Sequence, residues 1–325
     1  MTHPAPGGAT VVRLAPAKLN LTLAVVGRRP DGYHALHSVM VPLGLADRLS
    51  LAPAVGGEDT LHVAGADCGP TADNLVLRAL AATRTAVGRI GGPTGRVPDP
   101  LAARLEKRIP VAAGLAGGSA DAAAAIDGAL EAWGAELQPD ARLRVAAGLG
   151  SDVPFFLAGG PALVEGRGEV VRPLPGPIGG PLGVLLVTPA VPVPTPAVFA
   201  AYAAGARPAM PGSSRASSDH LAAELERGLS ASSLLDRAGI LAVANDLLPA
   251  SAAVVPDLVG LRRSLTRLLG RPVGQSGSGP TLWALYPSLA TAESAARDLH
   301  GALGDGRLTG PGDGPPSIIA TTILG

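Results

Sequence analysis

Apolar and polar residues alternate along the first part of the chain. In VVRLAPAKLNLTLAVVG, residues 11–27, leucine recurs at every second position from Leu19. A period of two places these side chains on one face of a β-strand. Pro16 predicts a break in this strand, and Pro42 indicates that the next strand, in VMVPLGLADRLSLAPA, lies at a sheet edge or carries a bulge. The apolar run PLGVLLVTP, from Pro181, predicts a buried strand.

Helical spacing of apolar residues follows in NLVLRALAATRTAVG, with Asn74 as a candidate N-cap. Alanine is the strongest helix former, so the alanine-rich run after Ser119 predicts a helix to about Trp133. In GSDVPF, Ser151 or Asp152 can cap a short helix with Pro154 in its first turn. Phe155 and Phe156, in an apolar run, are predicted core residues.

Glycine, proline and serine mark the connections. The Pro/Gly-rich stretch 173–181 predicts a crossing between an N-terminal domain, 1–172, and a C-terminal domain, 182–325. The segment 206–219, ARPAMPGSSRASSD, predicts a mobile loop, and QSGSGPTLWALY predicts a second glycine-rich turn that leads into a strand. Strands and helices mix without strict alternation, which predicts the α+β class.

Composition narrows the setting. The 325 residues are 47% hydrophobic with a net charge of zero, which supplies a core but no basic excess for nucleic acid or a membrane surface. The lone Cys68 forms no internal disulfide and fits a reducing compartment. We see no signal peptide and no apolar run of membrane-spanning length. These features predict a soluble, cytoplasmic protein.

Lysine is almost absent. Of 26 basic residues, only Lys18 and Lys107 are lysines. A lysine ammonium is a compact point charge, whereas arginine is a planar fork, so the retained lysines are candidates for a role in which the two differ. Chance retention on a solvated surface is the alternative.

PVAAGLAGGSADAAAAID, residues 110–127, joins a glycine-rich loop to the start of a strong helix. Free N–H groups and the positive end of the helix dipole make such a junction a candidate phosphate site. An ordinary glycine-rich turn before a buried helix explains the pattern equally well. The loop lacks the spacing of GxxxxGK[ST] and of GxGxxG, and the chain has neither HExxH nor GxSxG, which gives no support to Walker-type, Rossmann, zinc-protease or serine-hydrolase chemistry.

Six separate segments together resemble the GHMP kinase superfamily. They are PAKLN at 16–20, PDGYH at 30–34, PVAAGLAGGSADAA at 110–123, GSDVPF at 150–155, PTPAVF at 194–199 and SGSGP at 276–280. The resemblance extends from about residue 11 to 290. It implies a two-domain kinase with the active site in the cleft between the domains. The pair PAKLNL and RRPDGYH is similar to the members that phosphorylate the 2-hydroxyl of a cytidyl diphosphate sugar alcohol in non-mevalonate isoprenoid synthesis.

The resemblance implies a role for each matching residue. Lys18 and Asp152 match the catalytic lysine and aspartate. The positions matching the ATP site are Asn74, Lys107, Pro110, Val111, Ala112, Ala113, Gly114, Leu115, Ala116, Gly117, Gly118, Ser119 and Ala120. Those matching the substrate site are Asn20, Tyr33, His34, Thr195 and Phe199. Taken without the resemblance, Asp152 reads as an ordinary cap and Lys18 as a surface cation.

The cofactors implied are ATP and the Mg²⁺ carried with it, with no metal ligand assigned on the protein. The expected partner is the small-molecule substrate, with no nucleic acid and no membrane, in a monomer or weak homodimer. Another small-alcohol kinase of homoserine or mevalonate type and a non-catalytic ATP-binding paralogue are the alternatives.

The chain departs from the superfamily pattern in its loop. Ala112, Ala113 and Ala116 stand where relatives often carry glycine, and alanine tolerates fewer backbone conformations. Ala120 occupies the place of a second serine, which leaves Ser119 or water to contact the metal.

Overall fold

The computed structural model describes residues 9–89 and 97–325, and by its contacts the chain forms two compact units. The first holds the described residues up to Ala17, those from Ala46 to Val111, and Ala116–Leu157. The second holds Lys18–Leu45, Ala112–Leu115 and Ala158–Gly325. By this measure, residues 158–172 cluster with the second unit. The domain boundary expected at 173–181 stays a prediction.

Two long strands start in one unit and end in the other. The first unit also contains further strands and helices. The long strands are β1 (Val11–Asn20) and β3 (His34–Pro53). The first unit adds β4 (Thr60–Ala64), the 3₁₀ turn η1 (Thr71–Asp73), α1 (Leu75–Arg89), β5 (Leu101–Glu106), α2 (Gly117–Trp133), α3 (Pro139–Leu149) and α4 (Val153–Leu157). In this unit β5 pairs antiparallel with the second half of β3 and parallel with β4.

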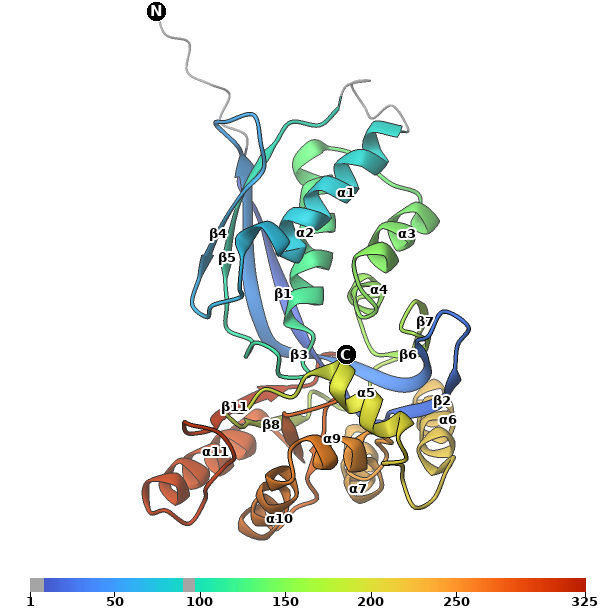
Figure 1. Cartoon of the computed structure of the whole chain (residues 1–325), viewed down its shortest axis with the longest axis vertical. Helices are drawn as coiled ribbons and strands as arrows, with labels where there is room; N and C mark the ends of the chain where they lie inside the picture. Colours follow the sequence, from blue (N-terminus) through green and yellow to red (C-terminus); the bar gives the residue numbers. More distant parts are fainter. Residues whose placement is uncertain (1–8, 90–96) are drawn as a thin grey trace, which may run out of the picture. The chain divides into compact units, whose positions relative to one another are not determined.

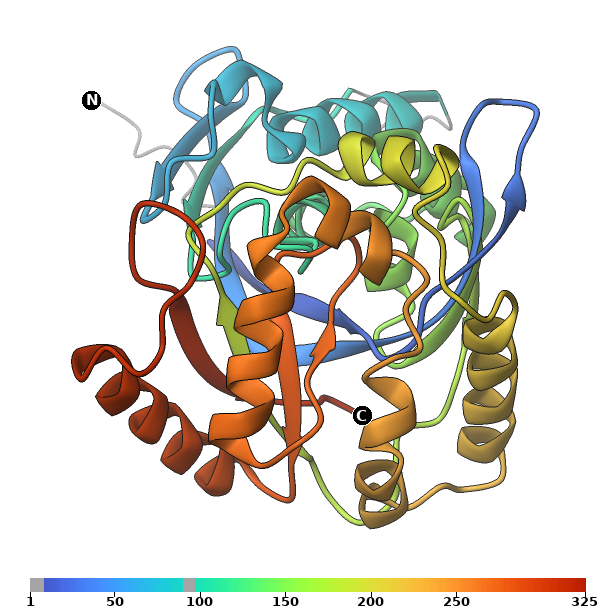
Figure 2. The ribbon, with the colours of Figure 1, turned by 60° about the horizontal axis from the view of Figure 1, so that its bottom comes forward.

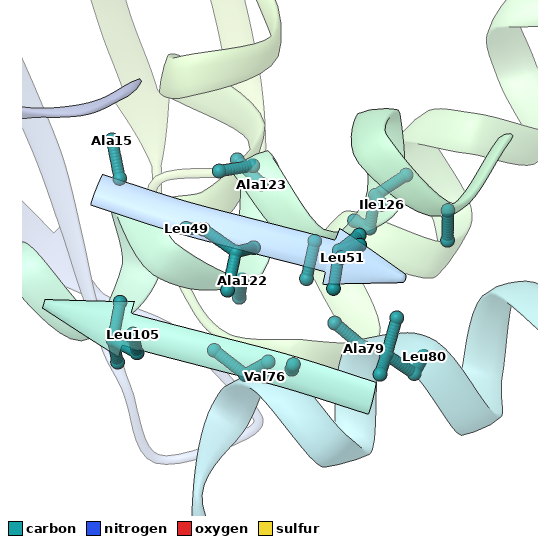
Figure 3. Close-up of a cluster of buried hydrophobic side chains, with 14 of the residues drawn as sticks. Ala15, Leu49, Leu51, Val76, Ala79, Leu80, Leu105, Ala122, Ala123 and Ile126 are labelled. Carbon is teal, nitrogen blue, oxygen red and sulfur yellow. The ribbon is translucent and has the colours of Figure 1, made fainter. Parts of the chain in front are cut away.

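The core of the first unit lies between these strands and the helices α1 and α2 (Figure 1). Leu49 and Leu51 of β3 and Leu105 of β5 meet Leu80 of α1 and Ile126 of α2, and each is at most 1% exposed (Figure 3). The facing positions of α2 are mostly alanines. These small side chains allow the helix to approach the sheet closely, so the alanine run serves packing as well as helix formation.

The second unit has part of one sheet, a separate sheet and seven helices within its described residues. It includes the end of β1 and the first part of β3. Its other elements are β2 (Ala24–Arg28), β6 (Ala162–Gly166), β7 (Val170–Pro173), β8 (Gly183–Thr188), α5 (Thr195–Ala203), α6 (Ser213–Glu226), α7 (Ala231–Asp236), α8 (Ala238–Leu241), α9 (Leu248–Val254), α10 (Asp257–Leu269), β9 (Gly274–Gln275), β10 (Leu282–Tyr286), α11 (Leu289–Gly304) and β11 (Ser317–Thr322). Its four-stranded sheet is antiparallel in the order β11-β8-β10-β9. Figure 2 shows α9 and α10 side by side.

Several sequence expectations are confirmed. The helix after the glycine-rich loop ends at Trp133, β8 is buried throughout, and the turn after Gln275 leads into β10. Phe155 is 1% exposed and contacts Phe156 edge-on, and Phe156 packs, partly buried, against the core of the first unit. No helix within the described ranges has the length and apolar character required to cross a bilayer.

Three expectations are wrong. β1 runs without a break through Pro16. The sheet-edge alternative for Pro42 is wrong, because β3 is a central strand that pairs with β6 through Met40 and with β5 from Arg48. Pro42 falls between these two ladders, so its absent N–H breaks neither, and the alternative of a bulge stays a prediction. The third concerns 206–219, which is irregular only to Gly212 before α6 begins. The serines suggested a loop, but Leu221, Ala222 and Leu225 give α6 a buried face that outweighs them.

Candidate active site

Lys18 and Asn20 lie at the end of β1 in the second unit, and both are at most 4% exposed. The Lys18 ammonium donates to Asn20 Oδ1. Asn20 Nδ2 in turn donates to Ser38 Oγ of β3 at 2.8 Å, and that hydroxyl donates to the Thr22 carbonyl at 2.6 Å. A buried ammonium needs such polar neighbours. Lys18 is therefore an oriented cation rather than a surface one.

The apex of the glycine-rich loop packs against the second glycine-rich turn. Ser276 Oγ donates to the Gly114 carbonyl at 3.0 Å, and a Cβ placed on Gly114 would lie 2.6 Å from the Ser276 carbonyl oxygen. A Cβ on Gly277 would lie 3.4 Å from Lys18 Nζ. The turn thus lies between the loop apex and the Lys18 ammonium, all within the second unit.

The loop holds two alanines in the left-handed region. Ala112 has φ of 53° and Ala116 has φ of 55°. For an alanine this conformation costs about 1–2 kcal/mol, which the rest of the structure has to offset. Ala116 is the N-cap residue of α2, so the loop passes into the helix at this left-handed residue. Because N–H groups at a helix start can bind an anion, a phosphate site at this junction stays a prediction.

Ser119 and Asp152 belong to neighbouring parts of the first unit. Ser119 lies in the first turn of α2, and its Oγ is 3.8 Å from a Cβ placed on Gly150. Gly150 leads directly into Asp152, the residue before α4. Asp152 thus directly precedes α4, and its turn lies beside the start of α2; a helix cap by Ser151 or Asp152 stays a prediction.

Lys107 is not on a solvated surface. Its side chain is 3% exposed, and its ammonium contacts Asp47 and, at 2.7 Å, Asp121 of α2. A Cβ on Gly117 would lie 3.3 Å from Lys107 Nζ, so this cation lies directly beneath the start of α2. The two carboxylates raise the pKa of Lys107 despite its burial. The structure thus places Lys107 beside the loop but holds its charge within an ion-pair triad.

Two carboxylates share this one ammonium, so a proton is favoured on one of them. Asp47 also accepts the backbone N–H groups of Arg108 and Ile109, whereas Asp121 Oδ1 is buried and has no hydrogen-bond partner among the described residues. Burial first, and then the nearby Asp47 charge, raise the pKa of Asp121 to about 7.

Asn74 caps α1, because its Oδ1 accepts the Val76 N–H at 2.9 Å. The next residue, Leu75, has its Cδ1 3.7 Å from a Cβ placed on Gly118. The start of α1 therefore lies against the start of α2, where the first glycine-rich loop ends. The Asn74 side chain is already engaged in capping, so its expected position beside the nucleotide stays a prediction.

Three aromatic rings meet in the second unit. His34 stacks on Phe199 with a centroid distance of 5.0 Å and an interplanar angle of 19°, and Tyr202 meets His34 edge-on at 5.9 Å. Burial, followed by the charges of Arg28 and Arg207, lowers the pKa of His34. Its ring is therefore neutral at pH 7, which suits stacking on an uncharged base.

Tyr33 does not join these rings. Its side chain is 54% exposed and lies beneath the Arg167 guanidinium, 5.4 Å from the ring centroid. Thr195 and Phe199 lie on α5 four residues apart, and Thr195 Oγ1 contacts Ser278 Oγ at 2.9 Å. One helix thus joins the aromatic cluster to the second glycine-rich turn.

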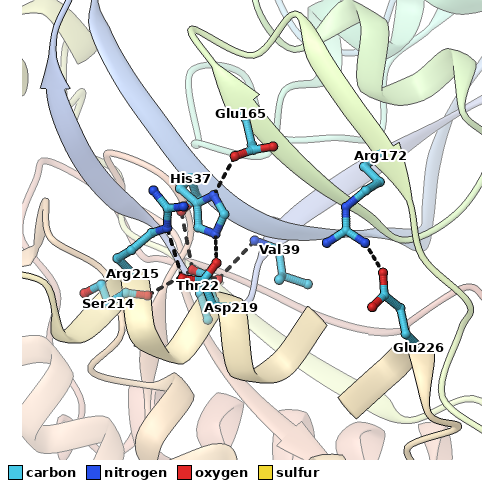
Figure 4. A network of polar contacts seen from close by, with 10 residues as sticks. Thr22, His37, Val39, Glu165, Arg172, Ser214, Arg215, Asp219 and Glu226 are labelled. Atoms are coloured by element: carbon cyan, nitrogen blue, oxygen red, sulfur yellow. Dashed lines mark hydrogen bonds and ion pairs between the residues drawn. The ribbon is translucent and has the colours of Figure 1, made fainter. Parts of the chain in front are cut away.

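A buried histidine braces the strand that carries His34 and Ser38. His37 is 1% exposed, and its ring nitrogens face Glu165 at 3.1 Å and Asp219 of α6 at 2.8 Å (Figure 4). Ser218, also on α6, donates to Thr22 Oγ1 at 2.7 Å. The serine-rich segment therefore contributes buried contacts behind Asn20.

Sequence reasoning did not find several residues of these networks. Tyr202 could have been found from its spacing, because it is three residues after Phe199 on the same helix. No local signal points to the others, since their partners are distant in sequence: they are Ser38, Asp47, Asp121, His37 and Asn245, whose Nδ2 donates to the Gly277 carbonyl at 2.9 Å.

Comparison with known proteins agrees with this geometry. The model of the GHMP kinases N terminal domain matches residues 74–160, which include the loop and Asp152. A solved homoserine kinase from Cytophaga hutchinsonii has the same fold, with a TM-score of 0.64, 16% identity and coverage of 99% of this chain and 97% of that one. The fold and the matched N-terminal domain are those of the GHMP kinases.

More specific relatives are the 4-diphosphocytidyl-2-C-methyl-D-erythritol kinases of Pelotomaculum thermopropionicum and Paramagnetospirillum magneticum. The first is 39% identical over 88% of this chain and 92% of its own length, and the second is 38% identical over 89% and 93%. A crystal structure of 4-(cytidine 5'-diphospho)-2C-methyl-D-erythritol kinase is 32% identical, with a TM-score of 0.69 and coverage of 97% of this chain and 100% of that one. The chain belongs to the 4-diphosphocytidyl-2-C-methyl-D-erythritol kinase family.

Proposed function

We propose that this chain transfers the γ-phosphoryl group of ATP to the 2-hydroxyl of 4-diphosphocytidyl-2-C-methyl-D-erythritol, in the non-mevalonate route to isoprenoid precursors. The observation that carries the substrate is the stack of His34 on Phe199, joined through α5 and the 276–279 turn to the surroundings of Lys18. Homoserine and mevalonate contain no nucleobase, so kinases that act on them need no such platform for the acceptor. Family membership supports the same substrate.

The aromatic cluster would hold the cytosine ring. His34 and Phe199 contact each other directly at 5.0 Å, so a pyrimidine bound between them requires a ring separation of about 7 Å. Tyr202, edge-on to His34, would limit how far that ring turns. Tyr33, beneath Arg167, would contribute only at the outer edge of this platform.

The loop from Pro110 to Ala120 would hold the ATP phosphates at the start of α2. Mg²⁺ bound with ATP would neutralise phosphate charge during transfer. The protein offers it little: the described residues contain no group of three His, Cys, Asp or Glu side chains able to bind a metal, and Ala120 has no hydroxyl. The donor set fits a cation carried mainly by the nucleotide, with the Ser119 hydroxyl as its protein ligand.

The chemistry then rests on Asp152 and Lys18. The substrate oxygen forms a bond to the γ-phosphorus, the bond from that phosphorus to the β,γ-bridging oxygen breaks, and Asp152 accepts the hydroxyl proton. Lys18, kept in place by Asn20 and Ser38, stabilises negative charge that grows in the transition state. The products are ADP and the 2-phosphate. We expect this to occur in the cytoplasm, in a monomer or weak homodimer.

The test is ADP release with Mg-ATP and one of three alcohols: 4-diphosphocytidyl-2-C-methyl-D-erythritol, homoserine or mevalonate. Turnover with the cytidyl compound alone is the expected result. Turnover with another alcohol would keep the kinase and discard the cytosine site. ATP binding without turnover on any alcohol would indicate a non-catalytic paralogue.

Asp152→Asn tests the base. We expect kcat to fall by about 10²–10⁴-fold with ATP affinity little changed, because the amide cannot accept the proton. Asp140→Asn, at an exposed position in the first turn of α3, is the matched control and should keep full activity. Near-normal turnover by Asp152→Asn would remove Asp152 as the base.

A further inference from the structure

A groove of about 960 Å³ lies in the second unit, lined by α8, α9, α10, the end of β9 and the start of β10. None of the residues assigned above to ATP or substrate lines it. Its volume is near the upper end of the range for small-molecule sites, about 300–1,000 Å³. Two of the helices that line it, α9 and α10, lie side by side in Figure 2.

All the charged side chains that line the groove are basic. The lining contains four arginines and no aspartate or glutamate. Arg263 and Arg267 are exposed on α10, and their side chains form no hydrogen bond or ion pair among the described residues. Arg271 lies over the Tyr286 ring, 4.7 Å from its centroid. Their charges are therefore available to a ligand.

Arg262 is the most enclosed of the four. Its Nε donates to the Val273 carbonyl at 2.6 Å and its Nη2 to the Ala242 carbonyl at 2.7 Å, and no carboxylate pairs with it among the residues that the structure describes. These bonds fix the guanidinium in the groove wall but leave its charge uncompensated. Burial accordingly lowers the pKa of Arg262.

The remaining lining is largely apolar, with Ala242, Val243, Leu248, Leu258, Val273 and Leu282 among its members. A simple inorganic anion would use the arginines and leave this surface wet. A ligand with one apolar part and one phosphate would use both, since arginine forks match phosphate oxygens in bidentate pairs. A groove of this volume fits a free small molecule better than a macromolecule.

We propose that this groove is a second ligand site that binds small phosphate esters bearing an apolar chain, through Arg262, Arg263, Arg267 and Arg271. The groove also includes Gln275, whose Nε2 donates to the Gly277 carbonyl at 3.3 Å. Gly277 belongs to the second glycine-rich turn, which lies beside Lys18. Occupancy of the groove is thereby connected, through one side chain, to the turn that contacts the phosphate loop.

The probe is n-hexyl phosphate, with inorganic phosphate and n-hexyl glucoside as controls, measured by calorimetry on the full chain with saturating Mg-ATP. We expect saturable binding of hexyl phosphate in the presence of Mg-ATP. Each control should bind at least tenfold more weakly, because one lacks the chain and the other the charge. Equal affinity for any control, or loss of binding when Mg-ATP is added, would overturn the proposal.

Two double variants locate the site. Arg263→Gln with Arg267→Gln should weaken hexyl phosphate at least tenfold, because two charge-assisted contacts are lost. Arg144→Gln with Arg297→Gln changes the net charge equally at exposed positions outside the groove and should leave binding unchanged. Equal affinity of both double variants for hexyl phosphate would overturn the assignment of the ligand to this groove.

A lipid headgroup presents the same phosphate chemistry. Sedimentation with phosphatidylcholine vesicles that contain phosphatidic acid separates the two sources, and we expect no association. Vesicle binding that is lost in the Arg263→Gln and Arg267→Gln variant would assign the groove to a membrane surface and overturn the free-ligand proposal.

Discussion

Gly114 is the residue at which the phosphate loop comes closest to the second glycine-rich turn. Its φ is 75°, and an added Cβ would lie 2.6 Å from the Ser276 carbonyl oxygen and 2.8 Å from that of Gly279. Backbone atoms cannot move aside as the end of a flexible side chain can. Both the conformation and the contact therefore require glycine here.

Gly114→Ala should lower the free energy of unfolding by about 2–3 kcal/mol, through left-handed strain and displacement of the turn. Urea denaturation measures this. Gly148→Ala is the control: it lies within α3, its Cβ would meet nothing within 4 Å, and helix propensity predicts a gain of about 0.5–1 kcal/mol. Equal stability of Gly114→Ala and the unsubstituted protein would show that the loop rearranges freely.

Ala116 presents the reverse case, an alanine at φ 55°. Ala116→Gly should raise the free energy of unfolding by about 0.5–1 kcal/mol, because relief of left-handed strain exceeds the added entropy of glycine. Ala113→Gly is the comparison, since Ala113 is 2% exposed and has no positive φ. This substitution should lower the free energy of unfolding by about 1 kcal/mol. A loss of stability in Ala116→Gly would mean that its methyl group packs more favourably than the strain costs.

At the scale of elements, the Lys107 triad ties α2 to β3 and to the end of β5. Asp121 has a folded-state pKa of about 7, above its ordinary value of 3.8, so the folded protein holds a proton that the unfolded chain releases. Between about pH 4 and 7 the free energy of unfolding therefore falls as pH rises. Below this window the contribution is constant.

Asp121→Asn should flatten this dependence, because the amide mimics the protonated carboxyl at every pH. We expect the stability difference between about pH 5 and 7 to shrink by on the order of 1–2 kcal/mol relative to the unsubstituted protein. Urea denaturation at both values measures it, with Asp140→Asn as the exposed control. Parallel pH profiles for Asp121→Asn and the unsubstituted protein would mean that Asp121 is ionised throughout.

For the whole molecule, each ligand should stabilise the folded chain by mass action. At about one hundred times its dissociation constant, Mg-ATP should raise the free energy of unfolding by about 2.7 kcal/mol, and so should cytidine diphosphate. In the His34→Ala variant, a fixed concentration of cytidine diphosphate should no longer raise the free energy of unfolding, because one ring of the stack is removed. Mg-ATP should stabilise this variant as much as the unsubstituted protein. Equal losses for both ligands would indicate that His34 supports the fold rather than the base.

Much of this molecule could be predicted from local pattern. The alanine run, the caps and the glycine-rich turns depend on residues within a few positions of each other, and the resemblance of PAKLN, PDGYH and GSDVPF to family motifs located the candidate site. Pro42 and the serines of 206–219 misled, because a proline or serine reports on its own backbone and not on the neighbours that tertiary packing supplies.

The sequence by itself determined the family, the two glycine-rich turns and the identity of the candidate catalytic pair. Only the tertiary structure decided that Lys107 is shared by two carboxylates, that Tyr202 rather than Tyr33 joins the His34 stack, and that four arginines line one groove. The physical reason is distance along the chain. Asp47 lies 60 residues from Lys107 and Ser38 lies 18 from Asn20, and such pairs meet only once the hydrophobic core has fixed the strands and helices that carry them.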